Sequence, residues 1–357
     1  MTQKTRAAEA FLSTFLAIAA GLVLSFAFLP FMGINPLSSF GLLFSSMFSD
    51  RYTIGTIFVK AAPLILTALS FAIAYRASLF NIGAQGQFYM GAICAVAVTL
   101  GLQNRIPAFL VILLAGLAGS LGGGAVGALI GFLKAKYHAN EFLVSMMSTY
   151  VIAELMDYLL RTFLREKAKD YLQTDSIDPS TWLPVIVGKT SVHLGVAFAV
   201  AAALLVWVLL FKTQVGFRIR AVGLNAEAAR MCGIRPETQC ILTLFISGFL
   251  AGFAGFIEVN GMQHMLITGL DADVGSYGIG IAILGSANPI GILFASVLFG
   301  ALKTGGTTLG QVSNVPASII DLMEGFVMIF VLISYFVRHK ISLSRTKRLL
   351  GKAVKHG

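Results

Sequence analysis

Uncharged polar side chains interrupt an otherwise apolar sequence at two places. The first interruption, FNIGAQGQF, holds Asn81, Gln85 and Gln87, and the second, GSANPIG at 285–291, holds Asn288. Carboxamides offer hydrogen-bond donors and acceptors without net charge. They suit a neutral, hydrogen-bonding solute better than an ion. The alternative is that each amide satisfies backbone groups left free where a helix breaks.

The segments around these interruptions are too apolar for a soluble protein. Of the 357 residues, 57% are hydrophobic and 12% are charged, whereas soluble domains carry about 25% charged residues. Several apolar runs approach the roughly 20 residues that a helix needs to cross a bilayer. We therefore expect an all-α, polytopic transmembrane protein with one membrane domain over 1–357.

The apolar runs predict ten spans. They lie near 10–31, 54–74, 84–101, 107–133, 141–162, 191–211, 238–259, 275–286, 290–303 and 317–337, the eighth and ninth being short. The first run continues well past Ala17-Ile18-Ala19, which mimics a signal-peptide cleavage site, so we expect it to remain as a span.

The two polar interruptions fall at membrane depth. Irregular backbone is tolerated there only where protein covers it or where it lines a watery cavity. Interrupted segments in both halves of a chain are typical of a translocation site. We therefore predict that Asn81, Gln85, Gln87 and Asn288, together with the neighbouring Phe80, line a substrate pathway.

The basic residues orient the chain. With the N-terminus inside, 17 of the 26 Lys and Arg residues fall in inside segments, as the positive-inside rule requires. Both termini are then cytoplasmic. The same rule explains the net charge of +10 without nucleic acid as a partner. Seven of the 17 lie in the tail 338–357, for which binding to membrane lipid is an alternative explanation.

Regularly spaced glycines and a short internal sequence similarity predict how the spans pack. Gly119, Gly123, Gly127 and Gly131 recur every four residues and give one smooth helix face, which lets helix backbones approach closely in lipid. AVGALIGFLK in the fourth span resembles FASVLFGALK in the ninth. The two stretches are five spans apart, and an odd number of spans reverses the direction in which the chain crosses the membrane. We therefore predict an inverted repeat that relates spans two to five, 54–162, to spans seven to ten, 238–337.

No catalytic or metal-binding group is apparent. VGKT at 187–190 lacks the earlier glycine of a phosphate loop, since Leu183 stands there. The five histidines and three cysteines show no metal-ligand spacing. Carboxylates that a proton-coupled carrier would need deep in the membrane lie mostly near span ends: Glu154, Asp157, Glu258, Asp321 and Glu324. A stand-alone carrier is therefore kept only as an alternative.

The inside loop 212–237 is basic and contains a helix-like run, NAEAARM, that ends near Gly233. Topology alone explains its charge, and a helix that docks into another subunit explains it equally well. GLNAEAARMCGI at 223–234 resembles the coupling-helix region of ABC importer permeases. LFNIGAQGQF, NEFLVSMMSTYVIA and GIGIAILGSANPIGILFASVLFGAL resemble further signatures, in the same order, of the ribose and branched-chain amino acid type. The nucleoside branch, which works with a BMP-type binding lipoprotein, is most similar.

The resemblance implies a permease subunit without an ATPase site of its own, in the cytoplasmic (inner) membrane of a bacterium. ATP would bind to partner ATPase subunits, and this chain would bind no cofactor. A second, different permease chain would complete the pathway, and an extracellular solute-binding lipoprotein would reach the loops 163–190 and 260–274. Residues implied in ATPase coupling are Arg218, Gly223, Asn225, Glu227, Ala228, Arg230 and Gly233.

The resemblance also suggests the cargo. Nucleobase edges and ribose hydroxyls would suit the amides of the first interruption, and Phe80, Phe88 or Tyr89 could add stacking. The chain departs from the family pattern at Gln85, Thr149 and Ala226, where glutamate, asparagine and proline are frequent. The first two departures leave simple sugars and branched-chain amino acids open as alternative substrates.

Overall fold

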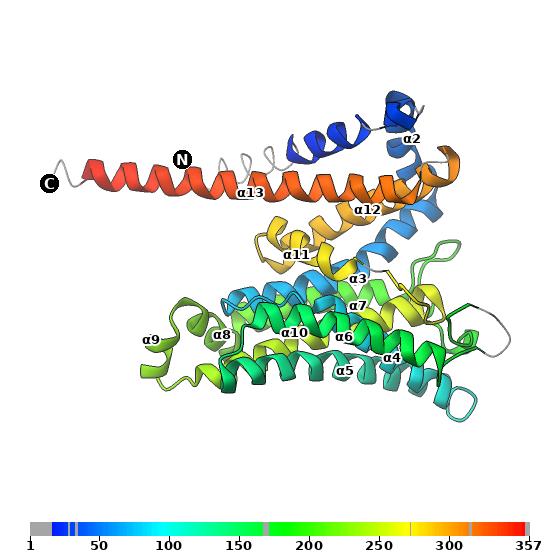
Figure 1. The fold of residues 1–357 in the computed structure, drawn as a ribbon, viewed down its shortest axis with the longest axis horizontal. Helices are drawn as coiled ribbons and strands as arrows, with labels where there is room; N and C mark the ends of the chain where they lie inside the picture. The colour runs from blue at the N-terminus through cyan, green and yellow to red at the C-terminus, as the bar shows by residue number, and fades with distance from the viewer. Residues whose placement is uncertain are drawn as a thin grey trace. The chain divides into compact units, whose positions relative to one another are not determined.

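The computed structural model describes residues 16–27, 29–32, 35–166, 171–271, 273–313 and 316–353. Every regular element in that part of the chain is a helix, which confirms the all-α prediction. The chain divides into two compact units, one of residues 50–301 and one of residues 1–49 with 302–357. Figure 1 shows the helices of both units.

The larger unit carries most of the helices. They are α3 (Arg51–Arg76), α4 (Ala84–Leu102), α5 (Ala108–Tyr137), α6 (Glu141–Arg161), η2 (Pro179–Thr181), α7 (Leu194–Lys212), α8 (Gln214–Leu224), α9 (Ala226–Met231), α10 (Pro236–Glu258), the π-helix η3 (Val259–Gln263), α11 (Val274–Leu284) and the first half of α12 (Pro289–Ser313). The smaller unit holds the helix Leu16–Phe26, η1 (Leu29–Met32), α2 (Pro36–Met47), the end of α12, and α13 (Ala317–Ala353).

Seven helices of the described residues are long and apolar enough to cross a membrane, and two shorter apolar helices accompany them. The chain is therefore a polytopic integral membrane protein, as predicted. The first span was expected at 10–31, but residues 10–15 lie outside the described part and the helix there covers Leu16–Phe26.

One predicted boundary was wrong. The ninth span was expected to end at 303, but α12 continues to Ser313. Within the polar run that follows, the hydroxyls of Thr307 and Thr308 are satisfied by donating to the carbonyls of Lys303 and Thr304, one turn back, at 2.7 and 3.1 Å. The basic tail predicted at 338–357 is helical as far as Ala353, as a continuation of α13, and its place in the cytoplasm stays a prediction.

Helix α3 is the centre of the larger unit. Asp50 caps its first turn by accepting a hydrogen bond from the Thr53 amide at 2.6 Å, which satisfies one of the free donors of a helix start. Almost all of its apolar stretch is buried. It contacts α7, α10 and α11, so both halves of the chain are built on it.

Helix α10 lies alongside α5 over much of its length (Figure 1). The predicted glycine face of α5 makes this contact possible. A Cβ atom on Gly123 would lie 2.4 Å from the carbonyl oxygen of Gly248, and one on Gly127 would lie 2.1 Å from that of Leu244. Glycine is therefore required where the two backbones meet.

Corresponding positions in the two halves make corresponding contacts. Gly131 of α5 meets α10 at Ile241, and Gly300 of α12 meets α3 at Ile57. In the next pair, Gly91 of α4 meets α10 at Gly252, and Gly278 of α11 meets α3 at Thr67. An inverted repeat over 54–162 and 238–337 would produce such exchanged contacts, and the repeat itself stays a prediction.

Candidate functional site

The first polar interruption is held together by its own amides. Asn81 donates to the Gln87 side-chain oxygen at 2.7 Å, and Gln87 donates back to the Asn81 oxygen at 3.1 Å. Asn81 also donates to the Ser247 hydroxyl of α10 at 2.7 Å, which in turn donates to the Ser70 carbonyl of α3. Neither amide is exposed. This cluster joins α3, α4 and α10 and leaves no Asn81 or Gln87 surface for a solute in this conformation.

Gln85 joins the first interruption to the start of α11. Its amide nitrogen donates to the Asp271 carbonyl at 3.1 Å, and its oxygen accepts from the Gly275 amide at 2.5 Å. Phe80 differs from the amides because 45% of its surface is exposed, beside Tyr75 and Phe71 at ring distances of 6.1 and 6.4 Å. Of the residues predicted for the pathway in this stretch, only Phe80 presents an open surface.

The second interruption is a tight turn between α11 and α12. Ser286 and Ala287 have left-handed backbone angles, φ +55° and +49°, which L-residues rarely adopt. Asn288 is exposed and caps α12 by accepting from the Ile290 amide at 3.1 Å. The structure therefore does not bring Asn288 into the cluster of Asn81 and Gln87.

Arg76, at the end of α3, links the two interruptions. Its guanidinium donates two hydrogen bonds to the Ala287 carbonyl, at 2.9 and 3.3 Å. It also lies over the ring of Phe211, which Arg220 approaches as well, each at 5.5 Å. From the sequence, Arg76 was only one of the inside basic residues that orient the chain. A single basic residue does not indicate which group it will bind.

The loop 212–237 folds into two short helices, α8 and α9. Thr213 caps α8 and Asn225 caps α9 through the amides of Gly216 and Ala228, at 3.2 and 3.0 Å. The predicted helix at 225–231 is therefore present. Gly233 has φ +79°, the left-handed conformation that ends a helix and favours glycine. Asn225, Glu227, Ala228 and Arg230 are exposed on or beside α9.

Gly223 fastens this loop to the first interruption. The Ser78 hydroxyl donates to the Gly223 carbonyl at 2.7 Å. A Cβ on Gly223 would lie 2.2 Å from the Arg76 carbonyl oxygen, so only glycine fits. This contact joins α8 directly to the residues that precede Asn81. Ser78, like Arg76, escaped the sequence analysis.

The charge of the loop is only partly neutralised. Arg230 forms an ion pair with Glu237. Arg218 lines an open cleft with Arg235 at the start of α10. Two large apolar side chains stand nearly free in the same loop, Leu224 at 89% and Met231 at 90% exposed. Both side chains lie in the loop, outside the predicted spans.

The loops expected to face a binding protein lie against each other. Backbone amides of Thr174, Ile177 and Leu183 donate to the carbonyls of Leu266, His264 and Asn260, each at 2.9 Å. The Trp182 and His264 rings stack at 3.7 Å. The structure thus brings 163–190 and 260–274 together as one surface.

One histidine is buried next to this surface, and a second is half-buried in it. His193 caps α7 by accepting from the Gly195 amide at 3.1 Å, with 2% of its surface exposed. Burial, and then the nearby His264, lowers the pKa of His193 to about 4. Burial also lowers the pKa of His264. Both rings are therefore neutral near pH 7.

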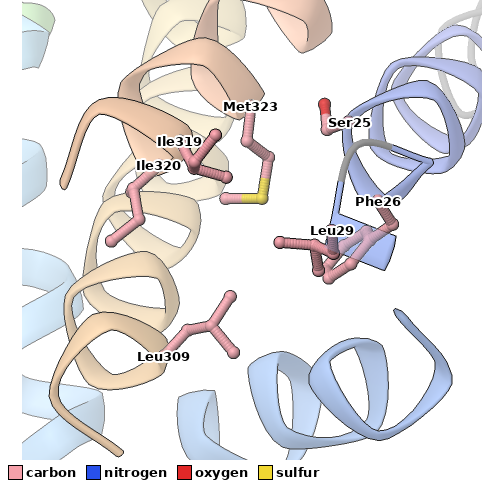
Figure 2. Close-up of a pocket in the computed structure, with 7 residues that line it drawn as sticks. All are labelled: Ser25, Phe26, Leu29, Leu309, Ile319, Ile320 and Met323. Atoms are coloured by element: carbon pink, nitrogen blue, oxygen red, sulfur yellow. The ribbon is translucent and has the colours of Figure 1, made fainter. Parts of the chain in front are cut away.

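No metal-binding cluster accompanies these features in the described residues. No group of three or more His, Cys, Asp or Glu side chains is placed there to hold a metal ion. Figure 2 shows a pocket in the smaller unit lined by apolar side chains and Ser25, with a volume of about 10 Å³. That is room for about one water molecule, and Ser25 already donates to the Gly21 carbonyl. It cannot hold a polar solute.

The buried spans, the two interruptions and the loop fastened to them define an integral membrane protein of the permease class. The family model described as branched-chain amino acid transport system / permease component matches residues 53–332. The chain belongs to this family.

Three members of the family are similar to this chain over most of their length. The guanosine ABC transporter permease protein NupP of Bacillus subtilis is 31% identical, over 90% of this chain and 93% of its own. The nucleoside ABC transporter permease protein NupB of Lactococcus lactis is 30% identical, over 98% and 96%. The glucose ABC transporter permease protein TsgB13 of Haloferax volcanii is 28% identical, over 93% and 90%.

Proposed function

We propose that this chain is a permease subunit of an ATP-driven importer of nucleosides. The observation that carries the coupling to a partner is the contact of Gly223 with Ser78, because it fastens the exposed loop to the first interruption. The names of two relatives at 30 and 31% identity, for a nucleoside and a guanosine permease, support the substrate class.

The ATPase subunit, which would bind the ATP, grips α9 and its flanks in this proposal. Gly223, Asn225, Glu227, Ala228, Arg230, Gly233 and Arg218 form or shape that surface. Its movement with ATP binding and hydrolysis would pull on Ser78 and Arg76, and through them on both interruptions. A partner can shift the permease between two states only if it binds them with different affinity, and an exposed loop fastened to the interior supplies that link.

The roles of the polar residues follow from their surroundings. We assign Asn81, Gln85 and Gln87 to holding the break between α3 and α4 in shape, since their amides are already paired. Phe80, with nearly half of its ring exposed, is the best stacking surface for a nucleobase as it passes. Asn288 would lie at the second break. In another state of the cycle the amide pair could open toward the solute.

A second permease chain, different from this one, would complete the pathway, and an extracellular solute-binding lipoprotein would dock on the joined loops 163–190 and 260–274. The membrane would be the cytoplasmic membrane of a bacterium, with both termini inside. The chain would have no ATPase site, and no cofactor of its own. These points rest on the resemblance of the sequence signatures and on the positive-inside rule.

Uptake is the direct test. Cells that express the chain with its partners should take up radiolabelled guanosine, and excess unlabelled nucleosides should compete while glucose and branched-chain amino acids should not. Competition by glucose alone would replace the substrate class with that of the 28% identical relative. Uptake that survives ATP depletion and collapses with the membrane potential would instead identify a stand-alone carrier.

A further inference from the structure

Helix α6 has two opposite sides of different character. The side that packs against α4 and α5 holds its buried residues, Ser145, Ile152, Met156 and Leu160. The opposite side is an exposed stripe, because residues three or four positions apart share one face of a helix. We call it the α6 stripe, and its members are Leu143, Met147, Tyr150, Glu154, Tyr158 and Arg161.

Glu154 is the member of the α6 stripe that lipid cannot cover. It lies about two turns before the end of α6 at Arg161, and α6 is one of the helices long and apolar enough to cross a membrane. A charged side chain at that depth is costly in hydrocarbon and nearly always faces a partner or a water-filled cavity. Glu154 is exposed, and no hydrogen bond or ion pair joins it to another described residue. Its partner therefore comes from outside the described chain.

Two tyrosines flank Glu154 on the α6 stripe. Tyr150 lies one turn before it and Tyr158 one turn after it, with 57% and 56% of their surfaces exposed. A carboxylate accepts two parallel hydrogen bonds, and an aromatic ring stacks on a flat partner. This arrangement suits a flat solute with two neighbouring N–H or O–H donors. A nucleoside such as guanosine has two pairs of this kind, on the edge of its base and at the two hydroxyls of its ribose.

The α6 stripe leads toward the loops that a binding protein would reach. Asp157, beside the stripe, accepts a hydrogen bond from the Thr268 hydroxyl, and the Thr268 amide donates to the Leu172 carbonyl at 3.1 Å. Helix α6 is therefore fastened to the joined loops at this end. On its buried side, α6 touches the first turn of α4, since a Cβ on Gly86 would lie 2.7 Å from the Thr149 Cα. The stripe thus follows a helix that connects the joined loops with the first interruption.

We propose that Glu154 is a specificity-determining residue of the solute pathway: its carboxylate accepts a neighbouring pair of donors on the nucleoside, while Tyr150 and Tyr158 hold the flat base. This inference rests on the proposed function and deepens it, because it places the solute on the α6 stripe. The amides of Asn81 and Gln87 are paired with each other, whereas Glu154 is open to a solute in the same conformation. From the sequence alone, Glu154 could be weighed only as a carboxylate that a proton-coupled carrier would need.

The first test is uptake of radiolabelled guanosine by cells that express the chain with its partners. Glu154→Gln keeps the size of the side chain but removes its charge and replaces one acceptor by a donor. It should raise the KM for guanosine by roughly ten- to a hundredfold, as expected when hydrogen bonds to a charged group are lost. The amounts of ATPase and second permease recovered on the tagged chain should not change. Leu155→Ala, at the next position of α6 and outside the stripe, is the control and should keep the wild-type KM.

Competing nucleosides identify the donor pair that Glu154 accepts. Inosine lacks the 2-amino group of guanosine, and 2′,3′-dideoxyguanosine lacks both ribose hydroxyls. With the wild type, at least one of the two should compete roughly tenfold more weakly than guanosine, and with Glu154→Gln that difference should largely disappear. Loss of the inosine difference assigns the base edge to Glu154, and loss of the dideoxyguanosine difference assigns the ribose. Equal competition by all three nucleosides with the wild type would overturn the inference.

Photolabelling gives a direct readout that needs no variant. The complex purified in mild detergent is irradiated with 8-azidoguanosine, and the labelled peptides are identified by mass spectrometry. We expect label on the α6 peptide that holds Tyr150, Glu154 and Tyr158, and excess guanosine should prevent it. Label confined to other helices would place the solute elsewhere and overturn the inference.

The outcomes separate this inference from the proposed function. If the wild type takes up guanosine but Glu154→Gln keeps its KM and its selectivity, Glu154 does not contact the solute and the importer proposal stands. If Glu154→Gln loses the second permease during purification, Glu154 pairs with that chain instead, and the inference fails. If the wild type takes up no nucleoside, both proposals fail. Should the variant not reach the membrane, photolabelling of the wild type decides.

Discussion

The side-chain amides of Asn81 and Gln87 hydrogen-bond to each other twice, across the break between α3 and α4 and out of contact with solvent. The two residues are six positions apart, and the second already lies in the first turn of α4. The break therefore has an internal polar clasp, completed by Ser247 of α10. This arrangement makes the two amides one unit, with consequences that can be measured.

Replacing Asn81 by Ala should destabilise the protein, because the Gln87 amide then stays buried without its partner. The expected cost is about 1–3 kcal/mol. Replacing both residues by Ala should cost less than the sum of the single changes, since no buried amide is left unpaired. Thermal unfolding in detergent measures each variant. Thr162→Ala, which removes an exposed hydroxyl bonded to the Tyr158 carbonyl, is the control. Strict additivity would contradict the clasp.

Gly223→Ala should uncouple the loop from the first interruption, because the added Cβ would lie 2.2 Å from the Arg76 carbonyl. Nucleoside uptake should fall by roughly tenfold, within the range of coupling free energies between sites, while ATPase still co-purifies. Uptake by cells, compared with ATPase recovered on the tagged chain, separates coupling from assembly. Gly188→Ala is the matched control, since nothing lies within 4 Å of its added Cβ. Equal uptake by both variants would remove Gly223 from the coupling path.

Arg76→Gln should loosen the link between the two interruptions, because it removes the forked contact with the Ala287 carbonyl and the stacking on Phe211. Arg76→Lys keeps the positive charge but not the two parallel N–H donors of the guanidinium. Compared with Arg76→Gln, it should give normal membrane insertion but not full uptake. Protein amount in the membrane and uptake per molecule are the two readouts. Full uptake with Lys would mean that charge alone is needed.

Gly123→Leu should prevent folding of the larger unit, since a Cβ there already meets the Gly248 carbonyl at 2.4 Å. Overpacking of this kind costs about 1–3 kcal/mol or more where backbones touch. The yield of monodisperse protein by size-exclusion chromatography measures it. Gly101→Leu, at an open position of α4, should be tolerated. A normal yield from Gly123→Leu would show that α5 and α10 can separate.

Stability should fall as the pH drops from about 6.5 to about 4, through the burial of neutral His193. Its pKa in the folded protein is about 4, below the 6.5 of an exposed histidine, so the unfolded chain binds more protons in that window and stability rises with pH. The stabilisation is complete above pH 6.5, and the part lost at low pH is about 3 kcal/mol.

The variant His193→Asn keeps a helix cap and should flatten this pH dependence in unfolding experiments. Some dependence should remain, because the pKa of His264 is lowered as well. His138→Asn, at an exposed left-handed position, should keep the wild-type pH profile. An identical profile for the two Asn variants would contradict the assignment to His193.

The sequence predicted the spans well because the hydropathy of a span depends only on residues that follow one another in the chain. The run 54–74 became α3, Arg51–Arg76, and the glycine steps of 119–131 pack closely against another helix, as the four-residue spacing predicted. That the other helix is α10 of the same chain was not predicted. Hydropathy placed the end of the ninth span too early, at 303, because the helix continues through the polar run to Ser313.

The site was harder to predict, because its contacts join residues far apart in the chain. The sequence FNIGAQGQF does not show that Asn81 and Gln87 hydrogen-bond to each other. A carboxamide can bind a solute or another amide, and its residue type is the same in both cases. The contacts of Ser78 with Gly223 and of Arg76 with Ala287 span 145 and 211 positions. Only the packing of α3, α8 and α12 brings them together.

Arg76 is the one basic residue between the second and third spans, and its guanidinium also holds the Ala287 carbonyl. In the proposed orientation the same cation instructs the insertion machinery during synthesis and later joins moving parts of the finished transporter. Biogenesis and turnover thus share one side chain. A mutation of Arg76 would therefore impair both membrane insertion and transport. A suppressor that restores insertion, such as a new lysine nearby, would leave the defect in transport uncorrected.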